Sequence, residues 1–405
     1  MNSDLNRPPP KIWPVLAAGA GLFAMTMGVR QTMGLFLGSL NGATGLGLSS
    51  ISLAFAFGQL WWGLTQPFAG AAADRFGAGR VLLAGLLLVA LGTFITPLMN
   101  STAGLILAIG MLAAGGAGMA GPAVIMATTA KLIPPERRGM ASGIVNAGGS
   151  LGQFVMAPVA GALMLNFGWA QAMQMLGLLV LLALPALWWL KGDAATMAAA
   201  GRPAMSTGQA LRGAIATPSY LLLCGGFLVC GFHVAFLATH LPGVVALCGL
   251  PLQFGAWALA LLGLFNIVGS VAMGWAVGRW RMKSLLSLVY ATRALAVLLF
   301  VLAPKSGLMV LAFAAVMGLT FLSTVPPTAG LVAKLFGVSH MATLFGVVML
   351  AHQIGGFIGA WLGGRVFEMS GSYNWVWGID ILLALGAALI HLPIKEARRA
   401  VAVAA

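Results

Sequence analysis

Residues 12–39 read IWPVLAAGAGLFAMTMGVRQTMGLFLGS, an apolar run interrupted by a single charge, Arg30. It is long enough to cross a bilayer as one helix, because about 20 apolar residues span the hydrocarbon core. Similar runs recur along the whole chain, whose 405 residues are 60% hydrophobic and only 7% charged. A soluble domain has about 25% charged residues, so this chain cannot cover a water-facing surface. The sequence therefore predicts a membrane protein with many spans.

Apolar runs between charged residues or Gly/Pro breaks predict twelve helices. The longest hydrophilic stretch, residues 191–217, separates them into two sets of six. We therefore predict an all-α membrane fold of two pseudo-symmetric six-helix bundles, residues 1–190 and 218–405, joined by a flexible cytoplasmic linker at 191–217. The predicted spans are 12–39, 49–73, 81–99, 103–131, 140–165, 169–190, 219–247, 253–277, 284–303, 307–334, 341–367 and 374–394.

The net charge of +14 indicates orientation in the membrane and not a nucleic-acid partner. Of the 21 Lys and Arg, Arg30 and Arg293 lie well inside predicted spans, and Lys305 and Arg365 lie on the side of the membrane opposite the basic loops. All the others lie at the termini or in the alternate loops, an excess that marks cytoplasmic loops. We expect a multi-pass protein of the inner or plasma membrane, in contact with lipid, with both termini in the cytoplasm and no bound nucleic acid.

The two halves of the chain repeat each other. One matching glycine would mean little in a chain with 56 of them, but five residues recur here at a constant offset of 203. Parallel six-helix repeats place a substrate site between the halves near the bilayer midplane. The repeated pairs are Lys131 and Lys334, Gly143 and Gly346, Gly152 and Gly355, Gly161 and Gly364, and Gly168 and Gly371.

A loop that follows the second predicted span of each half also recurs. It reads GAAADRFGAGR at residues 70–80 and GWAVGR at residues 274–279, where Gly278 replaces the acid. The first copy resembles the signature loop between helices 2 and 3 of the major facilitator superfamily, and the resemblance covers about residues 12–395. It implies transport by alternating access, with a cytoplasmic gate that contains Asp74, Arg75, Arg80 and Arg279.

Four further stretches resemble the monocarboxylate and oxalate/formate group of bacterial carriers in this superfamily. Carriers of oxalate pair an Arg in helix 8 with a Lys in helix 11, whereas this chain has Asn266 and His352 there. The resemblance therefore implies small monocarboxylates, or related hydroxy or keto acids, as substrates in preference to oxalate. The four stretches are GVRQTMG at 28–34, YATRA at 290–294, STVPPT at 323–328 and HQIGG at 352–356.

Arg30 is the first candidate for binding the substrate. An arginine at the centre of a membrane helix costs roughly 2.5 to 3.5 kcal/mol, and intramembrane ions are functional by default. The nearest acids in the sequence are Asp4 and Asp74, and neither lies in this span. A guanidinium binds a carboxylate in bidentate geometry, and Met27 lies on the same helix face. The alternative is an arginine bonded to carbonyls of a broken neighbouring helix.

Two histidines are candidates for contacting the substrate or carrying a proton. His233 has the repeat position of Arg30, so we interpret the two as facing each other across the cavity. His352 lies in the middle of the eleventh predicted helix. For each, the alternative is a histidine whose hydrogen bonds are satisfied within the protein. Further candidate polar contacts to the substrate are Ser323, Thr324, Gln353 and Asn266.

The acids predict the charge of the substrate. There are seven, and only Asp380 lies clearly inside a predicted span, on a peripheral helix. Arg293 also belongs to a peripheral helix, where we expect it to bond carbonyls or polar groups of adjacent C-terminal helices. A functional or a structural role stays open for both residues. The central cavity is thus expected to hold a fixed cation and no fixed anion, which favours an anionic substrate.

No cofactor, metal site or enzyme active site is predicted, because no metal-ligand cluster or nucleophile–base set is visible. The expected partners are a small organic anion and, in a symporter, protons, and we expect a monomer. Proton symport and anion exchange both stay open. The other readings are a drug-efflux carrier of the same superfamily and a membrane sensor that binds an anion without moving it.

Overall fold

The computed structural model describes residues 12–134, 138–190, 207–337 and 341–396. Within these ranges, eleven helical segments are long and apolar enough to cross a membrane. Helix α3, Leu48–Phe76, is a further helix of membrane-spanning length with 29 residues, whose hydropathy is lowered by polar residues such as Gln59 and Gln66. The predicted all-α fold with many spans is confirmed.

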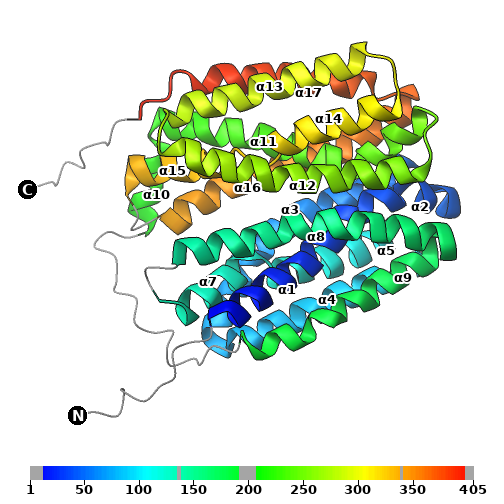
Figure 1. Ribbon diagram of the computed structural model, residues 1–405, viewed down its shortest axis with the longest axis horizontal. Helices are drawn as coiled ribbons and strands as arrows, with labels where there is room; N and C mark the ends of the chain where they lie inside the picture. Colours follow the sequence, from blue (N-terminus) through cyan, green and yellow to red (C-terminus); the bar gives the residue numbers. More distant parts are fainter. Residues whose placement is uncertain (1–11, 135–137, 191–206, 338–340, 397–405) are drawn as a thin grey trace, which may run out of the picture.

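Helices α1 to α9 form the N-terminal half (Figure 1). Several spans combine consecutive segments, because 3-10 or π turns interrupt the α-helix. The spans are α1 (Ile12–Thr32), η1 (Met33–Phe36) and α2 (Leu37–Thr44); α3; α4 (Ala78–Ile95) and η2 (Thr96–Leu98); α5 (Thr102–Leu105), η3 (Ile106–Ala113), α6 (Ala114–Met119) and α7 (Pro122–Leu132); α8 (Arg138–Phe167); α9 (Trp169–Val180) and η5 (Leu181–Trp188).

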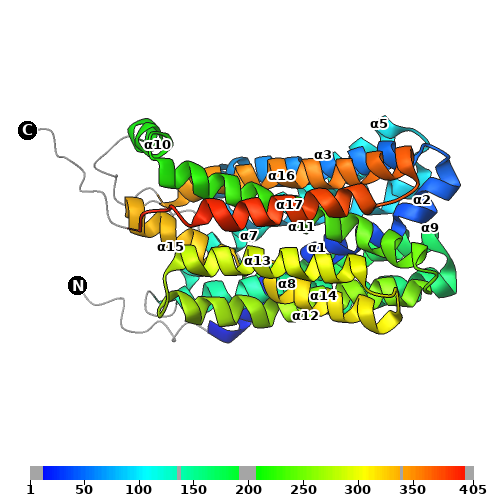
Figure 2. The same cartoon turned by 90° about the horizontal axis from the view of Figure 1, so that it is seen from above.

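Helices α11 to α17 form the C-terminal half. A short helix, α10 (Thr207–Ile215), precedes them inside the predicted linker and contacts α11 and α16 (Figure 2). The linker is therefore partly helical, while residues 191–206 lie outside the described residues. The remaining helices are α11 (Pro218–Leu247), α12 (Leu252–Val277), α13 (Met282–Leu302), α14 (Gly307–Thr320), α15 (Val325–Phe336), α16 (Met341–Ser370) and α17 (Asn374–His391).

The long helices run roughly along one axis, with the two halves side by side (Figure 1). Helix α1 begins and helix α17 ends at the same end of the bundle, on the left of Figure 1, which we call the basal end. The opposite end, which contains α2 and the start of α3, is the distal end.

The internal repeat appears as two matched helices. Helices α8 and α16 each have 30 residues and begin at positions 138 and 341, 203 residues apart. Each is followed by a repeated glycine with positive φ, Gly168 at 78° and Gly371 at 67°. Glycine adopts this left-handed conformation without steric cost, which explains its use as the residue that ends both helices.

The contacts between the two halves follow the same repeat. Helix α3 packs on α16, and helix α8 packs on α12. Near the middle of the bundle Gly63 of α3 lies against the side chain of Gln353. Adding 203 to Gly63 gives Asn266 of α12, whose amide donates to Ser150 Oγ of α8 at 2.8 Å. Ser150 in turn is the repeat position of Gln353.

Tight contacts between the halves continue from the middle of the bundle to the distal end. Gly34 lies so close to the carbonyl of Ala238 that no larger residue would fit without movement. At the distal end the backbone N–H of Ser49 donates to Glu368 Oε2 at 3.0 Å. A carboxylate at a helix N-terminus is favourable, so Glu368 links α16 to the start of α3.

Candidate functional site

Arg30 lies in the last turn of α1 and is partly exposed. Its guanidinium donates to Gln59 Oε1 of α3 and lies 3.5 Å from Gln31 Oε1. The guanidinium carbon stacks on Trp62, 4.5 Å from the ring centroid, a cation–π contact. Among the described residues, no carboxylate lies within ion-pair distance of Arg30. Within the described part of the chain the cation therefore has only neutral partners, and no carboxylate compensates its charge.

A small cavity lies beside Arg30, between α1, η1, α3, α4, η3 and α6. Its polar lining residues are Arg30, Gln59 and Thr93, and its other walls are apolar. The volume is about 40 Å³. A water molecule needs roughly 10–15 Å³ on the same measure, so the cavity has room for about three. Within the described part of the chain, the buried Thr93 hydroxyl has no hydrogen-bond partner. The cavity combines a cation, an amide and a free hydroxyl.

Gln59 connects this cavity to the junction of the two halves. A methyl group added at Gly356 of α16 would meet Gln59 Cβ at 3.5 Å. Gln59, Trp62 and Thr93 were not among the predicted site residues. Their only signal in the sequence is a polar or aromatic side chain inside an apolar run, and the sequence contains many of these. The predicted Met27 is partly buried and packs against the apolar core.

His352 and Gln353 lie in the middle of α16. The His352 side chain is buried, with its ring centroid 4.9 Å from that of Phe227. Neither ring nitrogen of His352, nor the Gln353 amide nitrogen, makes a hydrogen bond to a described residue. An unsatisfied buried polar group costs about 1–3 kcal/mol, which a ligand or a water molecule would recover. These two residues therefore stay candidates for contacting a substrate.

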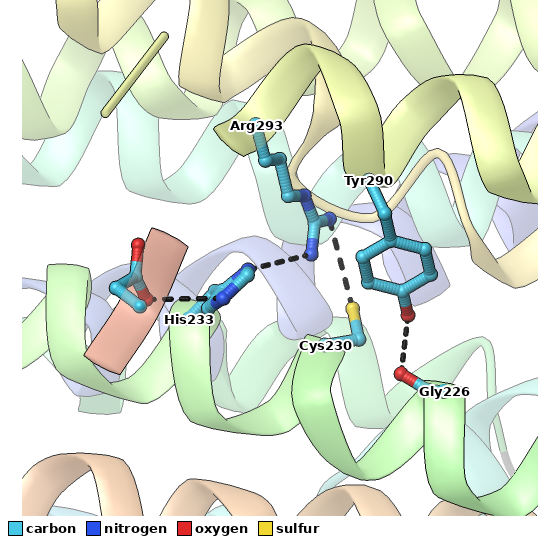
Figure 3. A network of polar contacts seen from close by, with 6 residues as sticks. Gly226, Cys230, His233, Tyr290 and Arg293 are labelled. Carbon is cyan, nitrogen blue, oxygen red and sulfur yellow. Dashed lines mark hydrogen bonds and ion pairs between the residues drawn. The ribbon is translucent and has the colours of Figure 1, made fainter. Parts of the chain in front are cut away.

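His233 lies in the middle of α11, and its described contacts do not include Arg30. Its Nδ1 atom is 3.5 Å from the guanidinium of Arg293 on α13 (Figure 3). Its Nε2 atom is 3.0 Å from Asp380 Oδ1 on α17. All three side chains are buried. The repeat offset correctly indicates a mid-helix polar residue, but this one binds inside its own half and does not face Arg30.

Arg293 stabilises a break in the tenth span, between the end of α14 at Thr320 and the start of α15 at Val325. Its guanidinium donates to the carbonyl of Thr320 and, at 2.8 Å, to that of Phe321. The last carbonyls of a helix lack intrahelical partners and carry partial negative charge. The expectation that Arg293 bonds carbonyls of adjacent helices is confirmed.

Asn266 accepts a hydrogen bond from a backbone N–H group in the same break. Its Oδ1 atom accepts the backbone N–H of Leu322 at 3.0 Å. Its amide nitrogen donates to Ser150 in the N-terminal half, as described above. Asn266 therefore links the break to the other half, and its amide is already engaged on both sides.

Ser323 and Thr324 form the rest of the break, and their hydroxyls bind within the C-terminal half. Ser323 donates to the carbonyl of Leu319. Thr324 Oγ1 lies 3.1 Å from Cys230 Sγ on α11. A direct role in substrate binding would require these bonds to be exchanged.

The predicted gating residues gather at the basal end. Asp74 lies near the end of α3, and its side chain lies outside what the structure describes. Arg75 and Arg80 are exposed on either side of the turn between α3 and α4. Arg279 follows α12, where its guanidinium carbon stacks 3.8 Å from the ring centroid of Trp275. A gating role for this group stays a prediction.

Comparison with known proteins gives the family of this fold. A family model described as Major Facilitator Superfamily matches residues 16–360 and also residues 223–404. Monocarboxylate transporter 13 of Rattus norvegicus is 25% identical over 393 residues, which cover 94% of this chain and 89% of that protein. The oxalate:formate antiporter of Oxalobacter formigenes is 28% identical over 168 residues, 42% of this chain and 40% of that one.

A solved structure gives the same fold. The inward-facing and occupied conformation of a bacterial homologue of the human lysosomal transporter Spinster aligns with a TM-score of 0.76. The two chains are 15% identical, and the alignment covers 95% of this chain and 97% of the other. The twelve membrane-length helices among the described residues, the two repeated halves and the family match lead to one conclusion: this chain belongs to the Major Facilitator Superfamily.

Proposed function

We propose that this carrier moves small organic anions of the monocarboxylate type across the membrane, as a proton symporter or an anion exchanger. The observation that carries the proposal is Arg30, a cation with only neutral described partners beside a small cavity. An anion would neutralise this charge, whereas a cationic substrate would add to it. The names of the relatives, a monocarboxylate transporter and an oxalate:formate antiporter, support the same class of substrate.

The geometry supports a bidentate contact with a carboxylate. Gln59 accepts from one guanidinium nitrogen, and Trp62 covers one face of the guanidinium plane. The remaining N–H groups form a planar fork that matches the two oxygens of a carboxylate. The Thr93 hydroxyl in the same cavity would serve a second polar atom of the substrate, such as a hydroxyl or keto oxygen. The small volume favours a substrate with few atoms.

Alternating access would follow from rocking of the two halves about their shared interface. The tight contacts at Gly34 and between Ser49 and Glu368 hold the distal ends together, which fits a state that opens at the basal end. The basic residues of the loops would place that end, and both termini, in the cytoplasm. The halves would move against each other along two helix pairs, α3 with α16 and α8 with α12.

Counterflow of labelled short-chain monocarboxylates into proteoliposomes tests the proposal. We expect Arg30→Ala to lower the rate by about 100-fold or more, because a charge-assisted bidentate contact is lost. Arg365→Ala is the matched control, since Arg365 is an exposed arginine on α16, and it should keep the wild-type rate. Wild-type counterflow by Arg30→Ala would overturn the role of Arg30.

A second candidate function is transport of lipophilic compounds. The observation that favours it is an apolar cavity of about 360 Å³ along α3 and α6, whose lining includes Trp61, Leu64, Phe68 and Met119. Drug-sized ligands occupy pockets of roughly 300–1,000 Å³. Thermal stabilisation of the purified protein by apolar drugs, without stabilisation by carboxylates, would favour this function over anion transport.

A further inference from the structure

A set of three buried polar residues lies apart from the cavity at Arg30. Arg293 and Asp380 are each 1% exposed and come from α13 and α17, with His233 of α11 between them. Asp380 is the only buried carboxylate among the acids whose side chains the structure describes. The anion transport proposed above does not use this set, although buried ionisable groups inside spans are costly and mark function.

The partners of His233 determine where its proton lies. A guanidinium can only donate, so Nδ1, which faces Arg293 at 3.5 Å, presents its lone pair. The proton of the neutral ring is then on Nε2, which lies 3.0 Å from Asp380 Oδ1 in a close contact that is not aligned as a hydrogen bond. In this state the set has one cation, one neutral ring and one anion, and its net charge is zero.

Of the groups in this set, one is favourable for binding an additional proton. A second proton on His233 would put an N–H group against the guanidinium of Arg293, with like charges in contact. The carboxylate of Asp380 is the remaining basic group. When it takes one proton from solvent it becomes a neutral acid, no other covalent bond changes, and the set then has a net charge of +1.

Protonation of Asp380 would change the charge balance at the break in the tenth span. Once Asp380 is neutral, the carbonyls of Thr320 and Phe321 are the main groups that compensate Arg293. The next residue, Leu322, donates its N–H to Asn266, and Asn266 donates to Ser150 of the other half. Hydrogen bonds therefore connect Arg293, through the backbone of the break and Asn266, to the interface on which alternating access depends.

We propose that Asp380, with His233 and Arg293, is the binding site of the proton that this carrier couples to its substrate, separate from the anion site at Arg30. The proposal rests on the transport function proposed above. It assigns coupling to the C-terminal half and substrate binding to the N-terminal half, and the Asn266–Ser150 bond is one direct path between the two.

Other titratable groups border the set from helices α11, α13, α16 and α17. Cys230 of α11 lies 3.7 Å from Arg293, and His352 of α16 lies near the same thiol. Tyr290 of α13 donates its hydroxyl to the Gly226 carbonyl at 2.5 Å, and its ring stacks on His391 of α17. None of these is a carboxylate, so Asp380 is the acid that the test must change.

Two assays on the same proteoliposomes separate coupling from transport. Counterflow needs no proton gradient, whereas accumulation against a concentration gradient needs an inward proton gradient. Asp380→Asn mimics the protonated acid, so we expect wild-type counterflow and no gradient-driven accumulation. Asp380→Glu should restore accumulation. His240→Gln is the control, because that buried histidine bonds Tyr373 and the Ala360 carbonyl and should keep both activities.

The outcomes also distinguish this proposal from the proposed function. Accumulation by Asp380→Asn at the wild-type level, or loss of counterflow in a correctly folded Asp380→Asn, overturns the proton site. If Asp380→Asn does not reach the membrane, a displaced pH midpoint of accumulation in Asp380→Glu supports the site, and an unchanged midpoint overturns it. Wild-type protein that exchanges but never accumulates also overturns it, while absence of all counterflow overturns the anion function itself.

Discussion

Arg30 and Arg293 are both arginines inside membrane spans, and the protein surrounds them differently. Arg293 is 1% exposed, donates to the carbonyls of Thr320 and Phe321, and reaches Asp380 through His233. Arg30 is partly exposed, has neutral described partners and borders a cavity.

The difference shows how to interpret a charge in a membrane helix. Removing one partner from a buried, compensated set leaves an isolated charge, so the protein is expected to depend on Arg293 for stability. No such set surrounds Arg30 among the residues that the structure describes, so the protein can lose Arg30 without leaving a described carboxylate unpaired. Stability should therefore depend more strongly on Arg293, and substrate binding on Arg30.

The largest effect is expected from Arg293→Ala. The substitution leaves Asp380 buried without its cation and removes the donor at the break, so the free energy of unfolding should fall by about 3–5 kcal/mol. Thermal unfolding in detergent measures this loss. The double variant Arg293→Ala with Asp380→Ala should be less destabilised than Arg293→Ala alone. An Arg293→Ala protein as stable as wild type would remove the distinction between the two arginines.

Arg30→Lys should have the next largest effect. It keeps the positive charge but replaces the planar fork by a point charge, so counterflow should fall by about tenfold while the unfolding temperature stays near wild type. Arg365→Lys provides the control for the same exchange at an exposed site. Equal rates for Arg30→Lys and wild type would show that charge alone, without bidentate geometry, is sufficient.

Glu368→Gln should shift the balance between conformations. It weakens the bond to the Ser49 N–H that joins the distal ends, so the population open at that end should rise about threefold. Distances between spin labels on α2 and the start of α12 report this population. Glu396→Gln is the control, because Glu396 bonds Lys283 and Lys334 at the basal end of the same half. An unchanged distance distribution in Glu368→Gln would contradict the role of this bond.

The smallest effect is expected from Thr93→Val. This near-isosteric change removes a hydroxyl that has no described partner, so the stability should stay at or above the wild-type level. The KM for a 2-hydroxy acid should rise about twofold, because one neutral hydrogen bond to the substrate is lost. The KM for the acid without the hydroxyl should not change. Equal changes for both substrates would indicate that Thr93 only shapes the cavity.

The sequence predicts the fold well because the fold depends on patterns that are local or periodic. Apolar runs place the spans within a few residues, and the offset of 203 matches α8 to α16. Helix α10 was not predicted, because the composition of this segment resembles a linker. The residues that it buries against the protein include the small Ala210 and Ala214, which give only a weak apolar pattern.

The site is less predictable, because contacts between helices join residues that are far apart in the sequence and leave no local pattern in either helix. The shortage of acids indicates that Arg30 lacks a carboxylate, but nothing in the sequence brings Gln59 and Thr93 to its cavity. The repeat predicts that His233 lies near the middle of its helix. The orientation of its ring depends on Arg293 and Asp380, which lie 60 and 147 residues away in the sequence. Ser323 and Thr324 mark the break in the tenth span, but their hydroxyls bind within their own half.

The central claim is that an anionic substrate binds Arg30 and neutralises its charge. Calorimetric titration of purified protein with short-chain monocarboxylates tests it directly, by comparing wild type with Arg30→Gln, which keeps hydrogen-bond donors but removes the charge. We predict that wild type binds a carboxylate and that Arg30→Gln, with unchanged thermal stability, does not. Equal affinity in the two proteins would contradict the claim.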